Sequence, residues 1–332
     1  MPRTSSRPSR LWCANNFPLS AVPSASPDGA PVVPQGDGVA RLLLVDGHAY
    51  AYRAFHAIRS LNGPDGAPTN AIFGFVKMLA KLRVTLEPTH IVVIWDGGLA
   101  VERMAALPGY KAQRPPMPEG LARQLDDIAA YLQAAGIASW CQDGVEADDR
   151  IAVVARRAAA AGARVLIASS DKDFMQLVTP AVGLINPNDK SERVWTDAEV
   201  VAKSGVRPQQ IVDWLSLIGD SVDNIPGVPG VGPKTATELL RQFGSVPELY
   251  RRLSELKSDR LRAALATAET NVRRNQDLIR LRDDVGGGFR LSDAAPAHVD
   301  SRRLLELFQR WGFRTLAREV EALRPAAQGP LL

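Results

Sequence analysis

The amino-acid sequence predicts a doubly wound α/β domain built on a parallel sheet. Apolar runs at 41–46, 90–96 and 164–171 have strand length, and each ends in an aspartate. Continuous apolar runs are typical of strands that are buried on both faces of a parallel sheet. Between these runs lie stretches with helical periodicity, at 70–87, 119–135 and 146–161. This alternation of strands and helices is typical of the α/β class.

The chain after about residue 205 has a different pattern, in which short helical segments are joined by turns rich in glycine and proline. The expected segments are 208–218, 233–243, 246–256, 258–281 and a final amphipathic stretch, 300–323. The glycine-rich stretch before residue 233 predicts a tight hairpin that opens a helix. Free backbone amides at such a helix start can bind phosphate without reading bases, although glycines also simply make turns.

Residues 1–40 are expected to form a disordered tail, because they are rich in Pro, Ser, Ala and Gly and contain neither Lys nor Glu. They faintly resemble an organelle transit peptide, and a true translation start at Val39 is the alternative. Residues 325–332 are expected to form a second tail. We expect a cytoplasmic, nucleoid-associated protein, with organelle targeting by residues 1–40 left open.

Composition excludes several functional classes. Two cysteines cannot build a thiolate zinc site, and the four histidines have neither metal-ligand spacing nor a Ser or Cys partner for nucleophilic catalysis. No apolar run approaches the ~18 residues of a membrane-spanning helix. Any metal ion would therefore have to be bound by oxygen atoms.

The formal net charge is +4, from 40 Lys and Arg against 36 Asp and Glu. If nine of the acids converge on one site, the rest of the surface is far more basic than this total indicates. A basic surface around an acidic site favours a polyanionic partner. The base composition of the genome is an equally good explanation for the arginine content alone.

The functional prediction is based on a set of carboxylate side chains. The carboxyl ends of parallel strands lie at one edge of the sheet, so the aspartates that end the three apolar runs should meet there. Asp220 and Asp223 have the i, i+3 spacing of one helical turn, and Glu146 and Asp149 share one face at the start of the helix 146–161. Each acid alone is explained as a helix cap, but the whole set would repel without bound cations. The candidate metal ligands are Asp46, Asp96, Glu146, Asp148, Asp149, Asp171, Asp173, Asp220 and Asp223.

Ligands that are all oxygen favour Mg²⁺ or Mn²⁺, and this set is larger than one octahedral ion with its waters would use. We therefore expect two divalent cations. Two ions in one site can activate a water molecule and stabilise both oxygens of an in-line displacement at phosphorus. The sequence thus predicts phosphodiester hydrolysis.

Short motifs with fixed spacing run from residue 41 to about 324. They include Leu-Val-Asp46-Gly-His, Tyr110-Lys111-Ala-Gln-Arg114, Glu146-Ala-Asp148-Asp149, Asp171-Lys-Asp173 and Asp220-Ser-Val-Asp223. In order and spacing they resemble the 5′ nuclease domain of bacterial DNA polymerase I and its flap endonuclease relatives. The resemblance implies a PIN-like (resolvase-like) core, a helical arch at about 99–118 and a C-terminal helix-three-turn-helix subdomain.

The resemblance also implies roles for the acids and for nearby cations. Asp46, Asp96, Glu146 and Asp148 would hold the first ion, and Asp171, Asp173 and Asp223 the second, with Asp149 and Asp220 close by. The sequence alone does not fix this partition. Lys111 and Arg114 in the arch, and Arg53 after the first strand, would stabilise charge on the phosphate that is cut. Solvated loop charges are the alternative for Lys111 and Arg114.

Candidate DNA contacts come from the arch, from the helix after the first strand and from the glycine-rich hairpin. Aromatic residues at the first two places would stack on an unpaired base, although at helical spacing such residues more often belong to the core. The hairpin would grip duplex DNA and, as in the family, bind K⁺. The arch departs from the family pattern in having Glu102, where relatives commonly have an aromatic residue before the arginine. The candidates are Tyr52, Phe55, Arg103, Tyr110, Gly227, Gly230, Gly232, Lys234 and Thr235.

The resemblance implies a 5′-3′ exonuclease and structure-specific 5′ flap endonuclease that acts in DNA repair or primer removal. The expected domains are a nuclease core at 41–204 and a helical DNA-binding region at 205–324, without a polymerase domain in the 332 residues. Expected partners are DNA with 5′ flaps, nicks or 5′ ends, and RNA–DNA primers; a monomer is expected. The alternatives are an RNase on a related carboxylate scaffold, which would not need the hairpin, and a non-catalytic protein that binds DNA junctions.

Overall fold

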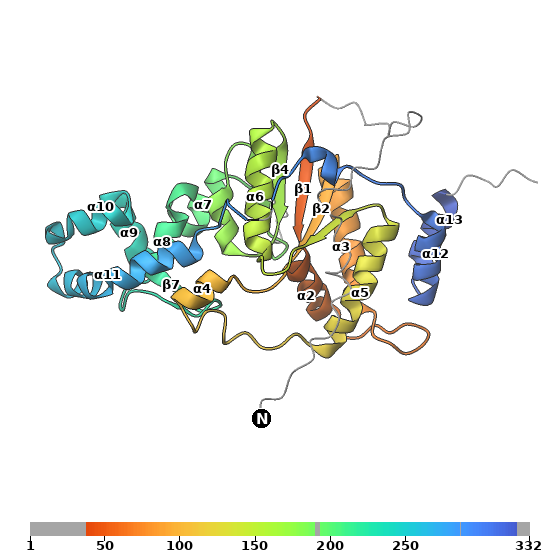
Figure 1. Ribbon diagram of the computed structural model, residues 1–332, viewed down its shortest axis with the longest axis horizontal. Helices are drawn as coiled ribbons and strands as arrows, with labels where there is room; N and C mark the ends of the chain where they lie inside the picture. The colour runs from red at the N-terminus through yellow and green to blue at the C-terminus, as the bar shows by residue number, and fades with distance from the viewer. Residues whose placement is uncertain (1–37, 190–192, 286, 324–332) are drawn as a thin grey trace, which may run out of the picture. The chain divides into compact units, whose positions relative to one another are not determined.

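The structure is a computed structural model, which describes residues 38–189, 193–285 and 287–323 (Figure 1). These residues form two compact units, and each unit is assembled from stretches that are separate in the sequence. The first unit contains the chain up to Trp95, residues 117–143 and the chain from Gly288 onward. The second unit contains 96–116 and 144–287. The predicted tails, at 1–40 and 325–332, lie almost wholly outside the described residues.

The first unit carries three parallel strands in the order β3-β2-β1, namely β1 (Arg41–Asp46), β2 (His90–Trp95) and β3 (Ala138–Cys141). Leu42 to Val45 of β1 are 1% exposed or less, which explains the continuous apolar run in the sequence. The helices of this unit are α2 (Gly47–Ala57), α3 (Asn70–Leu86), α5 (Glu119–Ala134), α12 (Ser301–Arg310) and α13 (Arg314–Leu323), with a short 3₁₀ turn η4 (Leu291–Ala294).

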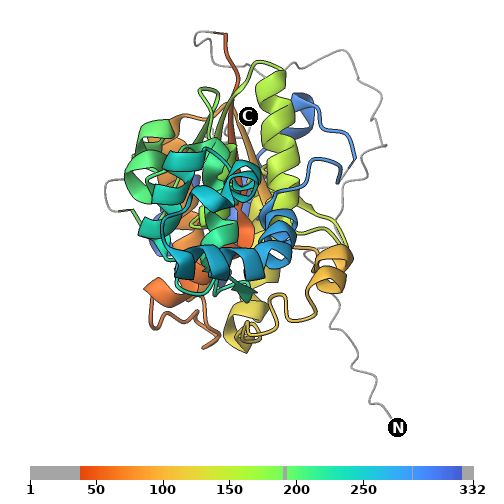
Figure 2. The same ribbon diagram turned by 90° about the vertical axis from the view of Figure 1, so that its left-hand side faces the viewer.

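The second unit carries β4 (Arg164–Ala168) and β5 (Val182–Ile185), which are parallel, and β6 (Val194–Trp195), which is antiparallel to β5. After β6 the unit is mainly helical, and this helical part faces the viewer in Figure 2. Its other elements are α4 (Val101–Ala106), α6 (Ala147–Ala160), η1 (Lys172–Leu177), α7 (Asp197–Ser204), η2 (Pro208–Gln210), α8 (Ile211–Ile218), β7 (Gly219–Asp220), β8 (Ile225–Pro226), α9 (Pro233–Phe243), α10 (Val246–Arg251), η3 (Leu253–Glu255) and α11 (Asp259–Ile279).

The predicted α/β class, with a mostly parallel sheet, is confirmed. The three predicted strands and the predicted helices 70–87, 119–135, 146–161 and 233–243 are present, with ends that differ by at most a few residues. The final amphipathic stretch is two helices, because Gly312 adopts φ +76° and breaks it between α12 and α13. No helix in the described ranges has both the length and the apolar character needed to span a membrane.

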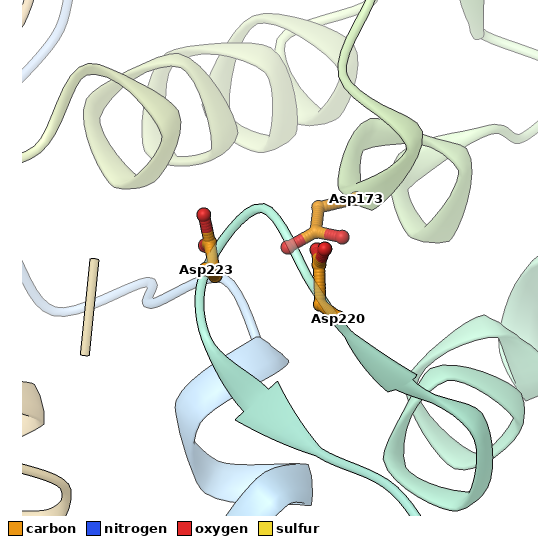
Figure 3. Close-up of side chains that lie close together, drawn as sticks. All are labelled: Asp173, Asp220 and Asp223. Atoms are coloured by element: carbon orange, nitrogen blue, oxygen red, sulfur yellow. The ribbon is translucent and has the colours of Figure 1, made fainter. Parts of the chain in front are cut away.

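The predicted helical turn at Asp220–Asp223 is wrong. Both residues belong to a small antiparallel hairpin, in which β7 pairs with β8 and residues 221–224 form the turn. Residues with i, i+3 spacing approach one another on a tight turn as they do on a helix, so the pattern could not distinguish the two. The hairpin still brings the two carboxylates to one side, as Figure 3 shows.

Close backbone packing requires a glycine at position 227, which is a different role from the predicted contact with DNA. A Cβ at this position would lie 2.3 Å from the carbonyl carbon and oxygen of Ile218, at the end of α8. Backbone atoms cannot move aside as a flexible side chain can, so Gly227→Ala should separate the hairpin from α8. We expect the free energy of unfolding to fall by about 2 kcal/mol or more. Urea denaturation would measure this loss.

Gly230→Ala is the comparison for that experiment, because a Cβ there meets nothing within 4 Å, although φ is +80°. Its cost should be limited to the strain of a left-handed backbone, about 1 kcal/mol. A loss for Gly227→Ala no larger than the loss for Gly230→Ala would contradict the close-packing explanation.

Candidate active site

Eight of the nine predicted metal ligands lie in the second unit, and the ninth, Asp46, lies in the first unit. Asp46 ends β1 and caps α2, where its carboxylate accepts a hydrogen bond from the amide of Ala49 (3.0 Å). Asp46 therefore acts as a helix N-cap, which is the ordinary role of an aspartate between a strand and a helix. The geometry below concerns the second unit alone.

Three carboxylates form a group that could hold a metal ion. Asp173, Asp220 and Asp223 each offer an oxygen atom, and these atoms lie within 4.8 Å of one another (Figure 3). Asp173 comes from η1, which starts just after β4, and the other two come from the β7–β8 hairpin. In the part of the chain that the structure describes, no other group of three meets the same criterion.

The electrostatics of this group fit a divalent cation. Burial raises the pKa of Asp173 well above its usual range, and the neighbouring charges of Asp171, Asp220 and Asp223 raise it further. Burial is also the main cause of the raised pKa of Asp171, with a further contribution from Asp223. Oδ1 of Asp173 is buried and has no hydrogen-bond partner within the described residues. Clustered carboxylate oxygens are the hard donors that Mg²⁺ and Mn²⁺ bind.

Glu146 is the centre of a second acidic region. It is 1% exposed and stands at the N-cap of α6. Its Oε2 accepts hydrogen bonds from Nη1 of Arg103 (2.6 Å), the hydroxyl of Tyr110 (3.2 Å) and Nζ of Lys111 (3.2 Å). All three donors belong to the stretch 99–118, which we call the arch segment. The arch segment is thus bound to Glu146 by two ion pairs and one hydrogen bond from a hydroxyl.

Asp96 and Asp148 are neighbours of this region. Burial raises the pKa of Asp96, and the charge of Glu146 adds to the effect, against opposing contributions from the Gly98 amide and from Lys111. Oδ2 of Asp148 lies 4.0 Å from Nζ of Lys111. Three of the four predicted ligands of the first cation thus lie near Lys111. The fourth, Asp46, belongs to the other unit.

Lys111 is a buried cation among carboxylates. It is 5% exposed, and besides Glu146 its Nζ lies 3.9 Å from Oδ2 of Asp223. Its backbone has φ +54°, and its amide donates to the carbonyl of Asp223 (3.0 Å). Burial acts to lower the pKa of Lys111, but the charges of Asp148 and Glu146 outweigh it and raise the pKa. The amine is therefore protonated at neutral pH.

Arg114 is the second cation of the arch segment at this site. Its Nη2 lies 2.7 Å from Oδ1 of Asp223, and its side chain is 41% exposed. It can therefore reach both the acids and a ligand from solvent. The other predicted catalytic cation, Arg53, is half-buried on α2 of the first unit, as are Tyr52 and Phe55. Their predicted roles remain predictions.

Two residues predicted to contact DNA are buried in this structure and have internal partners. Arg103 is 6% exposed, and its guanidinium is bound to Glu146 and Asp149. Tyr110 is 4% exposed, and its hydroxyl faces Glu146 and Asp223. Buried side chains with internal partners are not available to stack on a base or to bind a phosphate. Sequence reasoning could not see this, because arch residues were assigned to the surface from their place in a loop.

Asp149 is also not placed as a metal ligand. Its two oxygens accept from Nη1 and Nη2 of Arg103 (2.7 and 2.8 Å), and Oδ1 also accepts from the amide of Arg282 (2.9 Å). A bidentate arginine occupies the positions that a cation would need. In this structure Asp149 binds Arg103 instead, and its predicted role as a metal ligand stays a prediction.

Other residues at the site were not identified from the sequence. Lys172 places its Nζ 3.1 Å from Oδ1 of Asp220, and its position between Asp171 and Asp173 was the available signal. Asn224, with φ +57°, donates from its amide nitrogen to the carbonyl of Gly109 (2.7 Å). This hydrogen bond joins the hairpin turn to the arch segment.

The predicted helix start after the glycine-rich stretch is confirmed. α9 begins at Pro233 with Gly232 at the N-cap, and within the described residues this helix start has no side-chain cap hydrogen bond. Lys234 is exposed and Thr235 is half-buried. Amides that have no partner at a helix start can bind an anion.

Comparison with known proteins places the chain in a family. Residues 41–205 match the family of the 5′-3′ exonuclease N-terminal resolvase-like domain, and residues 206–302 match the 5′-3′ exonuclease C-terminal SAM fold. The chain belongs to the 5′-3′ exonuclease family. It is 36% identical to a 5′-3′ exonuclease of Aquifex aeolicus over 291 residues, which cover 87% of this chain and 99% of that protein.

The chain is also similar to part of larger proteins. It is 36% identical to DNA polymerase I of Bacillus caldotenax over 297 residues, which cover 88% of this chain and 33% of the polymerase. The chain thus spans about a third of the length of this relative.

Solved structures of the same fold include proteins in complex with DNA. A bacteriophage T5 flap endonuclease, in a pseudo-enzyme–product complex with DNA and metal ions, is 22% identical with a TM-score of 0.61; the match covers 85% of this chain and 98% of that chain. The catalytic core of Rad2 with a DNA substrate is 17% identical with a TM-score of 0.58, over 85% and 92%.

Removing divalent cations should destabilise the protein in a pH-dependent way. Asp171 and Asp173 have raised pKa values, so the folded state binds protons more tightly than the unfolded state. Without cations, their contribution to stability falls as pH rises from about 4 through the raised pKa values, and it stays low above them. We expect Mg²⁺ to raise the melting temperature more at pH 8 than at pH 5.

Differential scanning fluorimetry with EDTA or with a large excess of Mg²⁺ would measure these shifts. NaCl at matched ionic strength is the control for general screening. A melting temperature that is independent of Mg²⁺ at pH 8 would contradict cation binding by these acids.

Proposed function

We propose that this protein is a 5′-3′ exonuclease and 5′ flap endonuclease that hydrolyses DNA phosphodiesters with two divalent cations, Mg²⁺ or Mn²⁺. The main support for the proposal is the group of Asp173, Asp220 and Asp223, whose oxygen atoms lie close enough together to hold one cation. Family membership and the DNA complexes of structures with the same fold support it.

The proposed ligands fall into two sets. Asp173, Asp220 and Asp223 would hold one ion, with Asp171 adding negative charge beside them. Glu146, Asp148 and Asp96 would hold the other. When bound, the cations supply Lewis acidity toward the phosphate oxygens and the attacking water. The remaining chemistry belongs to the side chains.

The arch cations would act on the phosphate. Lys111 has its ammonium group at the acids already, protonated and shielded from water, so it can donate to a non-bridging phosphate oxygen as charge develops there. Arg114 is half-exposed beside Asp223, and its planar group can bind a second phosphate oxygen from the solvent side. Both donors require the phosphate to approach the carboxylates, which only bound cations would allow.

The duplex next to the cut would be bound without reading its sequence. Free amides at the start of α9 and the exposed amine of Lys234 contact phosphates rather than base edges. A K⁺ ion at the glycine-rich stretch before α9 is part of the same proposal. We further propose a monomer that acts on 5′ flaps, nicks, 5′ ends and RNA–DNA primers in repair or replication, in the cytoplasm at the nucleoid.

The test is cleavage of 5′-labelled flap, nicked and single-stranded DNA with Mg²⁺, using two flap sequences of equal length. We expect cutting near the flap base, at rates independent of base sequence and steeply reduced by salt. Cutting governed by sequence, or preferential cutting of RNA, would overturn the proposal. Tight flap binding without any cutting would indicate a junction-binding protein instead.

A further inference from the structure

Arg103 occupies a junction between three elements of the second unit. It belongs to α4, and its guanidinium binds Glu146 and Asp149 at the start of α6. The same group donates from Nε to the carbonyl of Leu278 (3.0 Å) and from Nη2 to the carbonyl of Arg280 (3.2 Å), where α11 ends. All four partners are internal, and the side chain is 6% exposed.

We propose that Arg103 is a positioning residue, which holds Glu146 in the orientation needed to bind a cation and fixes the end of α11 to the same point. The inference rests on the proposed function for its catalytic consequence. It does not rest on it for the geometry, since Oε2 of Glu146 receives its shortest hydrogen bond from Arg103 (2.6 Å). With Oε2 held, Oε1 is the oxygen left to face a cation; its contact with the amide of Ala100 is long, at 3.4 Å.

The surroundings of the arginine show that this arrangement is built in and not incidental. The segment that leaves α11 is also bound by Arg156, which donates to the carbonyls of Leu281 and Arg282 (3.2 and 3.1 Å). Gln176 of η1 pairs with the same segment through the carbonyl of Ile279 and the amide of Leu281. Arg103 is the member of this set that also contacts an acid proposed to bind metal.

The planar fork of arginine is required for this role. A lysine in its place would keep the charge, but a single ammonium group cannot make two parallel hydrogen bonds to Asp149 and also reach the two carbonyls. Arg103→Lys therefore tests geometry with charge held constant. Residues that orient metal ligands typically change metal affinity or activity about 10–100-fold when they are replaced.

The experiment compares the parent protein with Arg103→Lys and with Arg123→Lys. Arg123 lies on α5 and pairs with Glu119, and both side chains are at least 70% exposed. Three quantities would be measured: Mn²⁺ affinity by electron paramagnetic resonance without DNA, kcat and KM on a flap substrate, and the salt dependence of flap binding in EDTA.

For Arg103→Lys we expect Mn²⁺ binding to weaken about 10–100-fold and kcat to fall by a similar factor, with KM, DNA affinity and the salt slope unchanged. Arg123→Lys should match the parent in all three. Weaker flap binding with a salt slope reduced by about one would identify a phosphate contact and overturn the proposal. Unchanged Mn²⁺ affinity and kcat would overturn it as well.

If Arg103→Lys does not fold, Asp149→Asn tests the same bidentate pair by changing the carboxylate instead of the guanidinium. Asparagine can still accept from the Arg282 amide but pairs with only one nitrogen of the guanidinium, so Mn²⁺ affinity should fall several-fold. Values equal to those of the parent would contradict the proposal. If the parent protein cuts no DNA, the proposed function fails, and the Mn²⁺ comparison still decides the positioning role.

Discussion

Asp173→Asn should reduce cleavage of a 5′ flap at least about a thousandfold while the metal-free protein becomes more stable. The carboxylate contributes to a cation position whose electrostatic effect on the transition state is worth several kcal/mol. In EDTA the same charge is unfavourable, because Asp171, Asp220 and Asp223 repel it and burial desolvates it. Removing it should therefore raise the free energy of unfolding by about 1 kcal/mol.

Single-turnover cleavage and urea denaturation in EDTA would measure the two effects. Asp259→Asn is a matched control, since Asp259 is an exposed acid on α11 that pairs with Arg262. Flap binding should persist in the Asp173 variant. Full activity in that variant, or a lower urea midpoint in EDTA, would show that Asp173 is an ordinary structural acid.

Lys111→Ala should lower cleavage about 10²–10³-fold, the loss typical for one preorganised donor to a developing oxyanion. Unlike Asp173→Asn, it should also destabilise the metal-free protein, by about 2 kcal/mol or more, because Glu146 and Asp223 lose a buried counter-charge. The two variants thus share the loss of activity and differ in the sign of their effect on stability.

Lys77→Ala, at an exposed position of α3, controls for the loss of a lysine. The decisive comparison is made in EDTA, where bound cations cannot compensate for the missing ammonium group. If Lys111→Ala were as active as the parent, the amine would be only a structural counter-ion. If it were inactive but equally stable, its contacts with the carboxylates would be weaker than the distances indicate.

Much of the fold could be predicted because burial leaves a strong local signal. The runs that became β1, β2 and β4 are mainly apolar because most of their residues are buried, and the aspartates near their ends were visible as strand ends. α9 was predicted to the residue, since Pro233 opens it and Gly244 follows it. β3, β5 and β6 were missed: none is longer than four residues, and Ala138 to Trp140 are only partly buried.

The candidate site was predictable in its acids but not in its cations. Acidic residues at strand ends and helix starts follow from local pattern, whereas the direction of Arg103 depends on contacts with residues as distant in sequence as Leu278 and Arg280. The distinction between Asp149 and Asp173 has the same origin. Asp149 meets the guanidinium of Arg103, whereas Asp173 meets Asp220 and Asp223, and these partners are distant in the sequence.

The backbone of Lys111 has a consequence for laboratory evolution. A left-handed φ of +54° is adopted freely by glycine and tolerated by asparagine, but it is unfavourable for a lysine. Neither glycine nor asparagine carries a positive charge, so no residue at position 111 can suit both the left-handed backbone and the need for a cation. A selection for thermal tolerance in buffers rich in Mg²⁺ would therefore tend to replace this lysine by glycine or asparagine, and the surviving variants would be robust proteins with little nuclease activity.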